Sequence, residues 1–98
     1  MYVNVIDSYR YVVAICDKEL LGKRFEQGKF QLDVKENFYK GEEKSKEEVE
    51  KIITSMQAED ATFNIIGKKS VQTAIKSGLI SSENVGTIAN IPFTLILL

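Results

Sequence analysis

The sequence predicts an α+β fold: a single two-layer domain with a mixed β-sheet and two main helices packed on one face. The first observation is the spacing of apolar residues, which is helical in two segments and strand-like or continuous in several others. The second is size and composition. The chain has 98 residues, of which 44% are hydrophobic and 28% charged, as expected for one soluble globular domain over residues 1–98.

Predicted strands begin at the N-terminus. Residues 2–7 and 10–16 are dominated by β-branched and aromatic residues, and they flank a turn at residues 7–9. Residues 11–16 are apolar on both alternating faces, which predicts a central strand covered on both sides. Apolar and polar residues alternate in residues 29–35, which predicts a half-exposed strand.

The first main helix is predicted over residues 45–57. Ser45 and Glu48 have the spacing of a capping box, in which each side chain satisfies a free backbone donor at the helix start. Earlier in the chain, residues 17–25 are expected to form a single helical turn or a tight loop, in which Asp17 could be the N-cap and Gly22 the stop. Residues 37–44 are expected to form a loop or a short edge strand. The helix predicted over residues 45–57 has one apolar stripe, made of Val49, Ile52, Ile53 and Met56.

The second helix belongs to a strand–glycine–helix unit in residues 61–80. A strand leads to Gly67, and the helix that follows places apolar residues at helical spacing before Gly78 ends it. Residues 85–89 predict a further short strand, and Asn90 with Pro92 marks a break. The buried positions expected on the helix are Val71, Ala74 and Ile75.

Residues 91–98 form a final apolar segment with no charged residue. An exposed strand of this kind would be an aggregation hazard. We therefore expect it to lie within the sheet, or to be covered by a partner. A homodimer formed through residues 91–98 is one such arrangement.

Residue types limit the chemistry of this chain. It contains no histidine, which removes the commonest general base and zinc ligand, and its acidic residues lack the spacing of a calcium loop. We expect no metal and no cofactor, and a binding protein more than an enzyme. The single cysteine, Cys16, is expected to be a core residue.

A strand pattern directly after Met1 and the lack of a long apolar run predict a cytoplasmic protein without a membrane segment.

Charge is unevenly distributed. The net charge of −1 gives no overall attraction to nucleic acid or to anionic membranes. Residues 41–60 carry three basic and seven acidic side chains, whereas residues 61–98 carry three basic and one acidic. Any binding to RNA would therefore depend on local basic surfaces.

Three stretches of sequence resemble one known family. They are CDKELLGKRFEQGKFQLDV from Cys16, NFYKGE from Asn37, and ATFNIIGKKSVQTAIKSGLISSENVGTIANIP from Ala61. Together they resemble the small archaeal family called domain of unknown function 424, over about residues 1–92. The resemblance implies a small α+β cytosolic protein without an established activity, in a translation or ribosome-maturation setting. Phe93 and TLILL stand where the family tends to have a histidine and polar residues, so no role of that histidine carries over.

The first candidate site is an anion site at Gly67, Lys68, Lys69 and Ser70. The first N–H groups of a helix lack backbone partners, and glycine permits close approach of a phosphate to which lysines and a hydroxyl would add contacts. The spacing is not that of a P-loop, because Thr62 stands where the earlier glycine would be. The alternative is a plain strand-to-helix turn in which Ser70 helps to cap the helix.

The second candidate site is a nucleic-acid surface. Lys23, Arg24 and Lys29 could form a basic patch, together with Lys68 and Lys69 if the sheet brings the two sets together. Tyr39 is among the aromatic residues available for stacking on RNA bases. The alternative for Tyr39 is an aromatic anchor in the core.

The function predicted first is a binding module for RNA or for a ribosomal or translation protein. The alternatives are a phosphate-ligand protein or small enzyme using Gly67–Ser70, and a self-associating structural protein.

Overall fold

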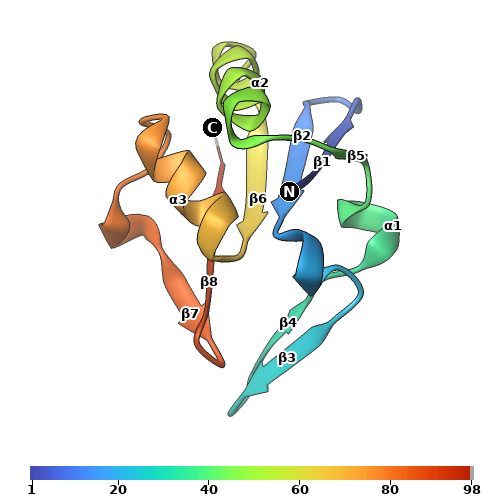
Figure 1. Cartoon of the computed structure of the whole chain (residues 1–98), viewed down its shortest axis with the longest axis vertical. Helices are drawn as coiled ribbons and strands as arrows, with labels where there is room; N and C mark the ends of the chain where they lie inside the picture. The colour runs from blue at the N-terminus through green and yellow to red at the C-terminus, as the bar shows by residue number, and fades with distance from the viewer. Residues whose placement is uncertain (98) are drawn as a thin grey trace.

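A six-stranded mixed β-sheet runs through the molecule in the order β5–β1–β2–β6–β8–β7 (Figure 1). The computed structural model describes residues 1–97. Strands β2 and β6 pair in parallel at the centre, and the other neighbouring strands of this sheet are antiparallel. The strands are β1 Tyr2–Ile6, β2 Val12–Cys16, β5 Glu42–Glu43, β6 Thr62–Ile66, β7 Gly86–Ile88 and β8 Ile91–Ile96.

Two helices cover one face of this sheet, as the sequence predicts. They are α2 (Lys46–Ala58) and α3 (Lys68–Lys76), which lie side by side in front of the strands in Figure 1. Ser45 caps α2 through the predicted capping box, with its side chain accepting from the Glu48 N–H and Glu48 accepting from the Ser45 N–H. The buried residues of this first core are Val3, Val13, Ile15, Val49, Ile53, Ala61, Phe63, Ile65, Val71, Ala74 and Ile80.

Smaller elements cover part of the opposite face. They are the 3-10 turn η1 (Lys18–Leu20), the short helix α1 (Glu36–Tyr39), and a hairpin of β3 (Arg24–Gln27) and β4 (Phe30–Asp33). The buried residues of this second core are Ala14, Cys16, Leu20, Val34, Tyr39 and Ile66. Alternate residues of β2 thus enter the two cores, which confirms the prediction of a central strand covered on both sides.

The hairpin differs from the sequence prediction. The half-exposed strand expected over residues 29–35 is β4, but it pairs with β3 in a separate two-stranded sheet. The first two residues of β3 fall in the segment 17–25, which was expected to be a helical turn or a tight loop. Gly28 makes the tight connection possible, because its φ of 61° lies in the left-handed region that glycine adopts at low cost.

The C-terminal strands form a hairpin with a two-residue turn. Ile88 pairs with Ile91, and the intervening Ala89 and Asn90 have φ values of 51° and 66°. Two successive positive φ angles are typical of a type I′ turn, whose twist matches that of the flanking strands. Strand β8 lies between β6 and β7, so the expected strand within the sheet is confirmed over its described part, and Leu98 lies outside the described residues. Within residues 1–97, no helix is long and apolar enough to cross a membrane.

Candidate binding surface at the start of helix α3

A groove of about 290 Å³ opens where β2 and β6 end. Because these two strands are parallel, their carboxyl ends meet at the same edge of the sheet, which brings the turn after Cys16 against the turn after Ile66. The groove therefore joins two segments that are far apart in the sequence. Its lining residues are Asp17, Glu19, Leu20, Gly67, Lys68, Lys69, Ile91 and Pro92.

The Asp17 carboxylate occupies the start of α3. Its Oδ2 accepts from the Lys69 N–H at 3.1 Å, and its Oδ1 accepts from the Ser70 N–H at 2.8 Å and from the Ser70 hydroxyl at 2.7 Å. Asp17 is only 3% exposed, so a buried carboxylate satisfies two free backbone donors of the helix and matches the positive end of its dipole. Asp17 is the N-cap residue of η1, as predicted, but its side chain makes no capping bond there, because it is turned to α3.

Gly67 permits this arrangement. Its φ of 112° is unfavourable for other residues, and a Cβ at this position would lie 2.3 Å from Cγ of Asp17. The Gly67 N–H is also used, since it donates to the Pro92 carbonyl at 2.8 Å. The close approach that the sequence suggested for a phosphate is made by the carboxylate of Asp17.

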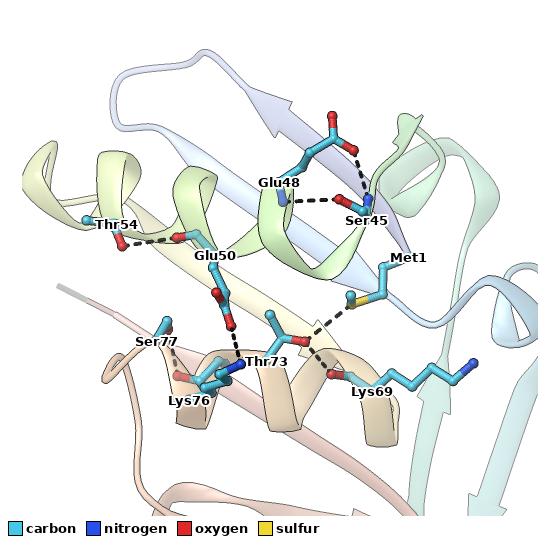
Figure 2. Close-up of polar contacts among 10 residues, drawn as sticks. Met1, Ser45, Glu48, Glu50, Thr54, Lys69, Thr73, Lys76 and Ser77 are labelled. Carbon is cyan, nitrogen blue, oxygen red and sulfur yellow. Dashed lines mark hydrogen bonds and ion pairs between the residues drawn. The ribbon is translucent and has the colours of Figure 1, made fainter.

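These contacts change which groups of the anion candidate face solvent. The N–H groups of Lys69 and Ser70 already have an anionic partner, so a phosphate on the same donors would have to displace Asp17. The lysine side chains remain exposed, and in residues 1–97 neither Lys68 nor Lys69 takes part in an ion pair. Figure 2 shows the Lys69 side chain extending away from its neighbours, whereas Lys76 points toward Glu50, with 3.6 Å between Nζ and Oε1.

The basic residues of the second candidate site lie on the β3–β4 hairpin and the segment that enters it. Lys23, Arg24 and Lys29 are all exposed. Arg24 pairs with Glu26 at 3.2 Å and donates to the Gln31 side chain, which neutralises part of this surface. The hairpin is held against the β7–β8 turn, where the Ala89 N–H donates to the Gln27 side chain at 2.7 Å.

Tyr39 belongs to the second core. It is 6% exposed and meets Phe38 edge to face, with ring centroids 5.0 Å apart. Burial, and secondarily the nearby Cys16, raises the pKa of Tyr39 to about 12. The ring is therefore unavailable for stacking on a base in this structure, because it fills space beneath the sheet. Exposed aromatic rings lie elsewhere, at Tyr9 and Phe30.

Cys16 is buried in the same core, as expected for a lone cysteine on an apolar strand. Burial, with a smaller contribution from the Asp17 charge, raises the pKa of the thiol to about 12. The thiol therefore stays protonated near neutral pH and is a poor nucleophile. In residues 1–97, no three acidic or cysteine side chains converge as a metal site would require.

Sequence reasoning missed the partnership of Asp17 with the start of α3. The usable signal was an Asp directly after one buried strand, together with a Gly–Lys–Lys–Ser helix start after another. If those strands are parallel neighbours, the carboxylate and the free N–H groups meet. The spacing of residues along the chain does not by itself show that pairing.

Comparisons with known proteins agree with this fold. A family model described as "Protein of unknown function (DUF424)" matches residues 6–98. The crystal structure of an uncharacterized conserved protein from Methanopyrus kandleri is similar, with a TM-score of 0.85 and 22% sequence identity. The match covers 97% of this chain and 88% of that protein. A comparison with curated proteins finds no match.

Proposed function

The chain belongs to the protein family of unknown function DUF424, and we propose that it is a non-enzymatic binding module for RNA or a translation protein in a ribonucleoprotein. The observation that carries this proposal is the charge of α3. Every charged residue of that helix is a lysine, and Lys68 and Lys69 stand unpaired within the described chain at the helix start.

These lysines lie where the helix itself disfavours them. A cation in the first turn opposes the helix dipole, and each such charge costs about 0.3–1 kcal/mol when exposed. Buried Asp17 offsets part of this repulsion. A local violation of helix preference is often a sign of a functional position, and exposed lysine side chains suit contacts with a phosphate backbone.

The surface proposed for RNA comprises Lys68 and Lys69, with Lys23, Arg24 and Lys29 of the hairpin region as a second basic set. The net charge of −1 favours binding confined to such patches, with strong dependence on salt. RNA would contact this protein chiefly through phosphates. A translation protein with an acidic surface would use the same lysines.

The test is charge reversal at the start of α3. The double variant Lys68→Glu and Lys69→Glu should weaken binding to single-stranded RNA at least about tenfold at low salt, measured by fluorescence anisotropy, because two phosphate contacts become repulsive. Lys35→Glu with Lys40→Glu is the matched control, since both residues are exposed and the charge change is equal.

Association in the native host provides the second readout. The tagged chain should sediment with ribosomal particles at low salt and leave them as salt rises, and the α3 variant should remain in the soluble fraction. Sedimentation of the unaltered chain entirely apart from ribonucleoprotein at low salt would sink the proposal.

The alternative is a phosphate-bearing small ligand in the groove beside Gly67–Ser70, in a binding protein or a small enzyme. The volume of about 290 Å³ and the two lysines on the groove wall favour it. Titration with inorganic phosphate or a nucleotide, followed by NMR, should then shift the amides of Gly67 to Ser70 selectively. Unchanged amides at saturating ligand would discard this alternative.

The third candidate is self-association through residues 91–98. Leu95 is 55% exposed and Leu97 is 72% exposed, and both lie on strand β8 or directly after it. The variant Leu95→Asp with Leu97→Asp should convert an oligomer to a monomer in sedimentation velocity. A folded monomer both before and after the change would reject this candidate.

A further inference from the structure

A groove between the free edge of β1 and helix α2 lies apart from the α3 surface. It consists of two adjoining hollows of about 490 Å³ and 330 Å³, which share Val5 and Ile52 in their walls. None of its lining residues lines the groove beside Gly67. The lining residues of both hollows are Val3, Asn4, Val5, Gly41, Glu42, Lys44, Lys51, Ile52, Ser55 and Met56.

The edge of β1 is only half covered. Strand β5 pairs with Tyr2 and Val3 and goes no further along β1. The chain crosses the edge at Gly41, where a Cβ would lie 2.0 Å from the Val3 carbonyl oxygen, so only glycine fits at this crossing. Beyond it, no neighbouring strand covers Val5 within the described residues.

The backbone of Val5 faces outward. The Met1 carbonyl accepts from the Lys44 N–H at 2.8 Å, which shows that Met1 presents its backbone groups to the β5 side. Backbone direction alternates along a strand, so Val3 and Val5 face the same side and Asn4 faces β2. Both the N–H and the C=O of Val5 are therefore open to an added strand.

The floor of the groove is apolar, and its rim carries a cation. Val5 is 42% exposed, and Ile52 and Met56 of α2 are half-buried. Lys51 lies on the α2 rim, and no ion pair in residues 1–97 includes it. The other rim cation, Lys44, is already paired with Glu42 at 2.9 Å.

We propose that this groove binds an extended peptide segment of a partner protein by strand addition to β1. The segment would run antiparallel to β1 and exchange two backbone hydrogen bonds with Val5. One large apolar side chain would rest on Val5, Ile52 and Met56, and an acidic side chain would reach Lys51. The apolar floor makes the groove unsuited to nucleic acid. Lys51 is the rim cation without an ion pair in residues 1–97, so it is the group that an acidic side chain of the segment would contact, with Glu47 and Glu50 outside the groove on the other side of Lys51.

The test is selection from a library of random heptapeptides displayed on phage, with the intact chain as target. Recovered peptides should combine a large apolar residue with an aspartate or glutamate. Selection on the Lys51→Glu variant should replace the acidic preference with a basic one. The control is Lys46→Glu, which makes the same charge change on the same helix but lies outside this groove.

NMR locates the contact of a selected peptide on the unaltered chain. Titration should shift the Val5 amide and the Ile52 and Met56 side chains, and Lys51→Glu should weaken affinity at least about fivefold. The proposal is overturned if no peptides are enriched, or if enrichment is indifferent to Lys51→Glu. It is also overturned if the chain alone dimerises and Val5→Asp abolishes the dimer, because the occupant is then a second copy.

Discussion

The Asp17 carboxylate accepts three hydrogen bonds from the first turn of α3 while its side chain is almost completely shielded from water. It links the end of β2 to the helix that follows β6, two segments that only the parallel pairing brings together. A buried carboxylate of this kind sets the position of α3, and with it the positions of Lys68 and Lys69.

Replacing Asp17 with alanine should lower the free energy of unfolding by about 2–4 kcal/mol, because it leaves three buried or half-buried donors without a partner. Gly67→Ala should also destabilise the domain, by about 2 kcal/mol or more, through its positive φ and its clash with the carboxylate. Urea unfolding of both single variants measures these losses.

The double variant tests whether the two residues act on each other. With Asp17→Ala in place the clash at Gly67 disappears, so the combined loss should be smaller than the sum of the two single losses by about 1 kcal/mol or more. Strict additivity would contradict the direct contact. Gly28→Ala serves as the control, because its positive φ is not accompanied by any close neighbour.

Among the individual residues, the sequence predicted those at the start of α3 but not the role of Asp17. An Asp after a strand can cap any helix start within reach, and its nearest candidate in sequence is the turn that follows it. Its partner in the structure is more than fifty positions away, at Ser70. Secondary-structure propensity depends on residues that are neighbours in sequence, so it gives no indication of a contact at that separation.

Among the secondary-structure elements, α2 is the one that the sequence specified most completely. The capping box, the apolar stripe and the helix start all agree with the structure, because each depends on residues within about one or two turns of one another. The β3–β4 hairpin was specified less well. Its second strand alternates in sequence, but β3 is short and mostly exposed, so its conformation depends on pairing with β4.

Ser45→Ala should destabilise the domain by about 1 kcal/mol, because the Glu48 N–H loses its side-chain partner. The Ser45 backbone and side chain hold the pKa of Glu48 below its usual value. The contribution of Glu48 is therefore present above its ordinary pKa and is lost as pH falls through the lowered one. Thermal unfolding near neutral and acidic pH should show a smaller acid-induced loss in Glu48→Gln, which has no carboxylate to titrate, whereas Ser45→Ala keeps the backbone donor to Glu48. An identical loss in Glu48→Gln and the unaltered chain would contradict this assignment.

The whole molecule is a sheet with a core on each face, and the two cores differ in what they bury. The helix side buries aliphatic side chains and Phe63, whereas the hairpin side also buries the ionisable groups of Cys16 and Tyr39. The α+β class and the two main helices were predictable from apolar spacing. The elements that cover the second face were not predictable, because α1, η1 and the hairpin are too short to show a periodic pattern of apolar residues.

The second core makes the domain sensitive to alkali. Cys16 has a pKa of about 12 in place of 9.0, and Tyr39 has one of about 12 in place of 10.0, so the folded state keeps protons that the unfolded chain releases. The contribution of these two groups to stability should be complete below about pH 9 and should fall as pH rises toward 12, by up to about 1.4 kcal/mol per pH unit for each group.

Urea unfolding at pH 8, 9 and 10 should therefore show a decline that steepens with pH. Cys16→Ala should flatten the decline between pH 9 and 10, where Cys16 is the group that titrates first. The same slope in both proteins would show that folding does not raise the pKa of the Cys16 thiol. Comparison at pH 8 separates this effect from the loss of packing.

The parallel pairing of β2 with β6 also has a consequence for how the chain reaches its native state. Val12 pairs with Thr62, whereas β1 with β2, β3 with β4, and β7 with β8 are joined by short turns. Closing a loop of about 50 residues has an entropic cost on the order of 3–4 kcal/mol, which the local hairpins avoid. We expect the hairpins and α2 to form early, and the central pairing to set the folding rate.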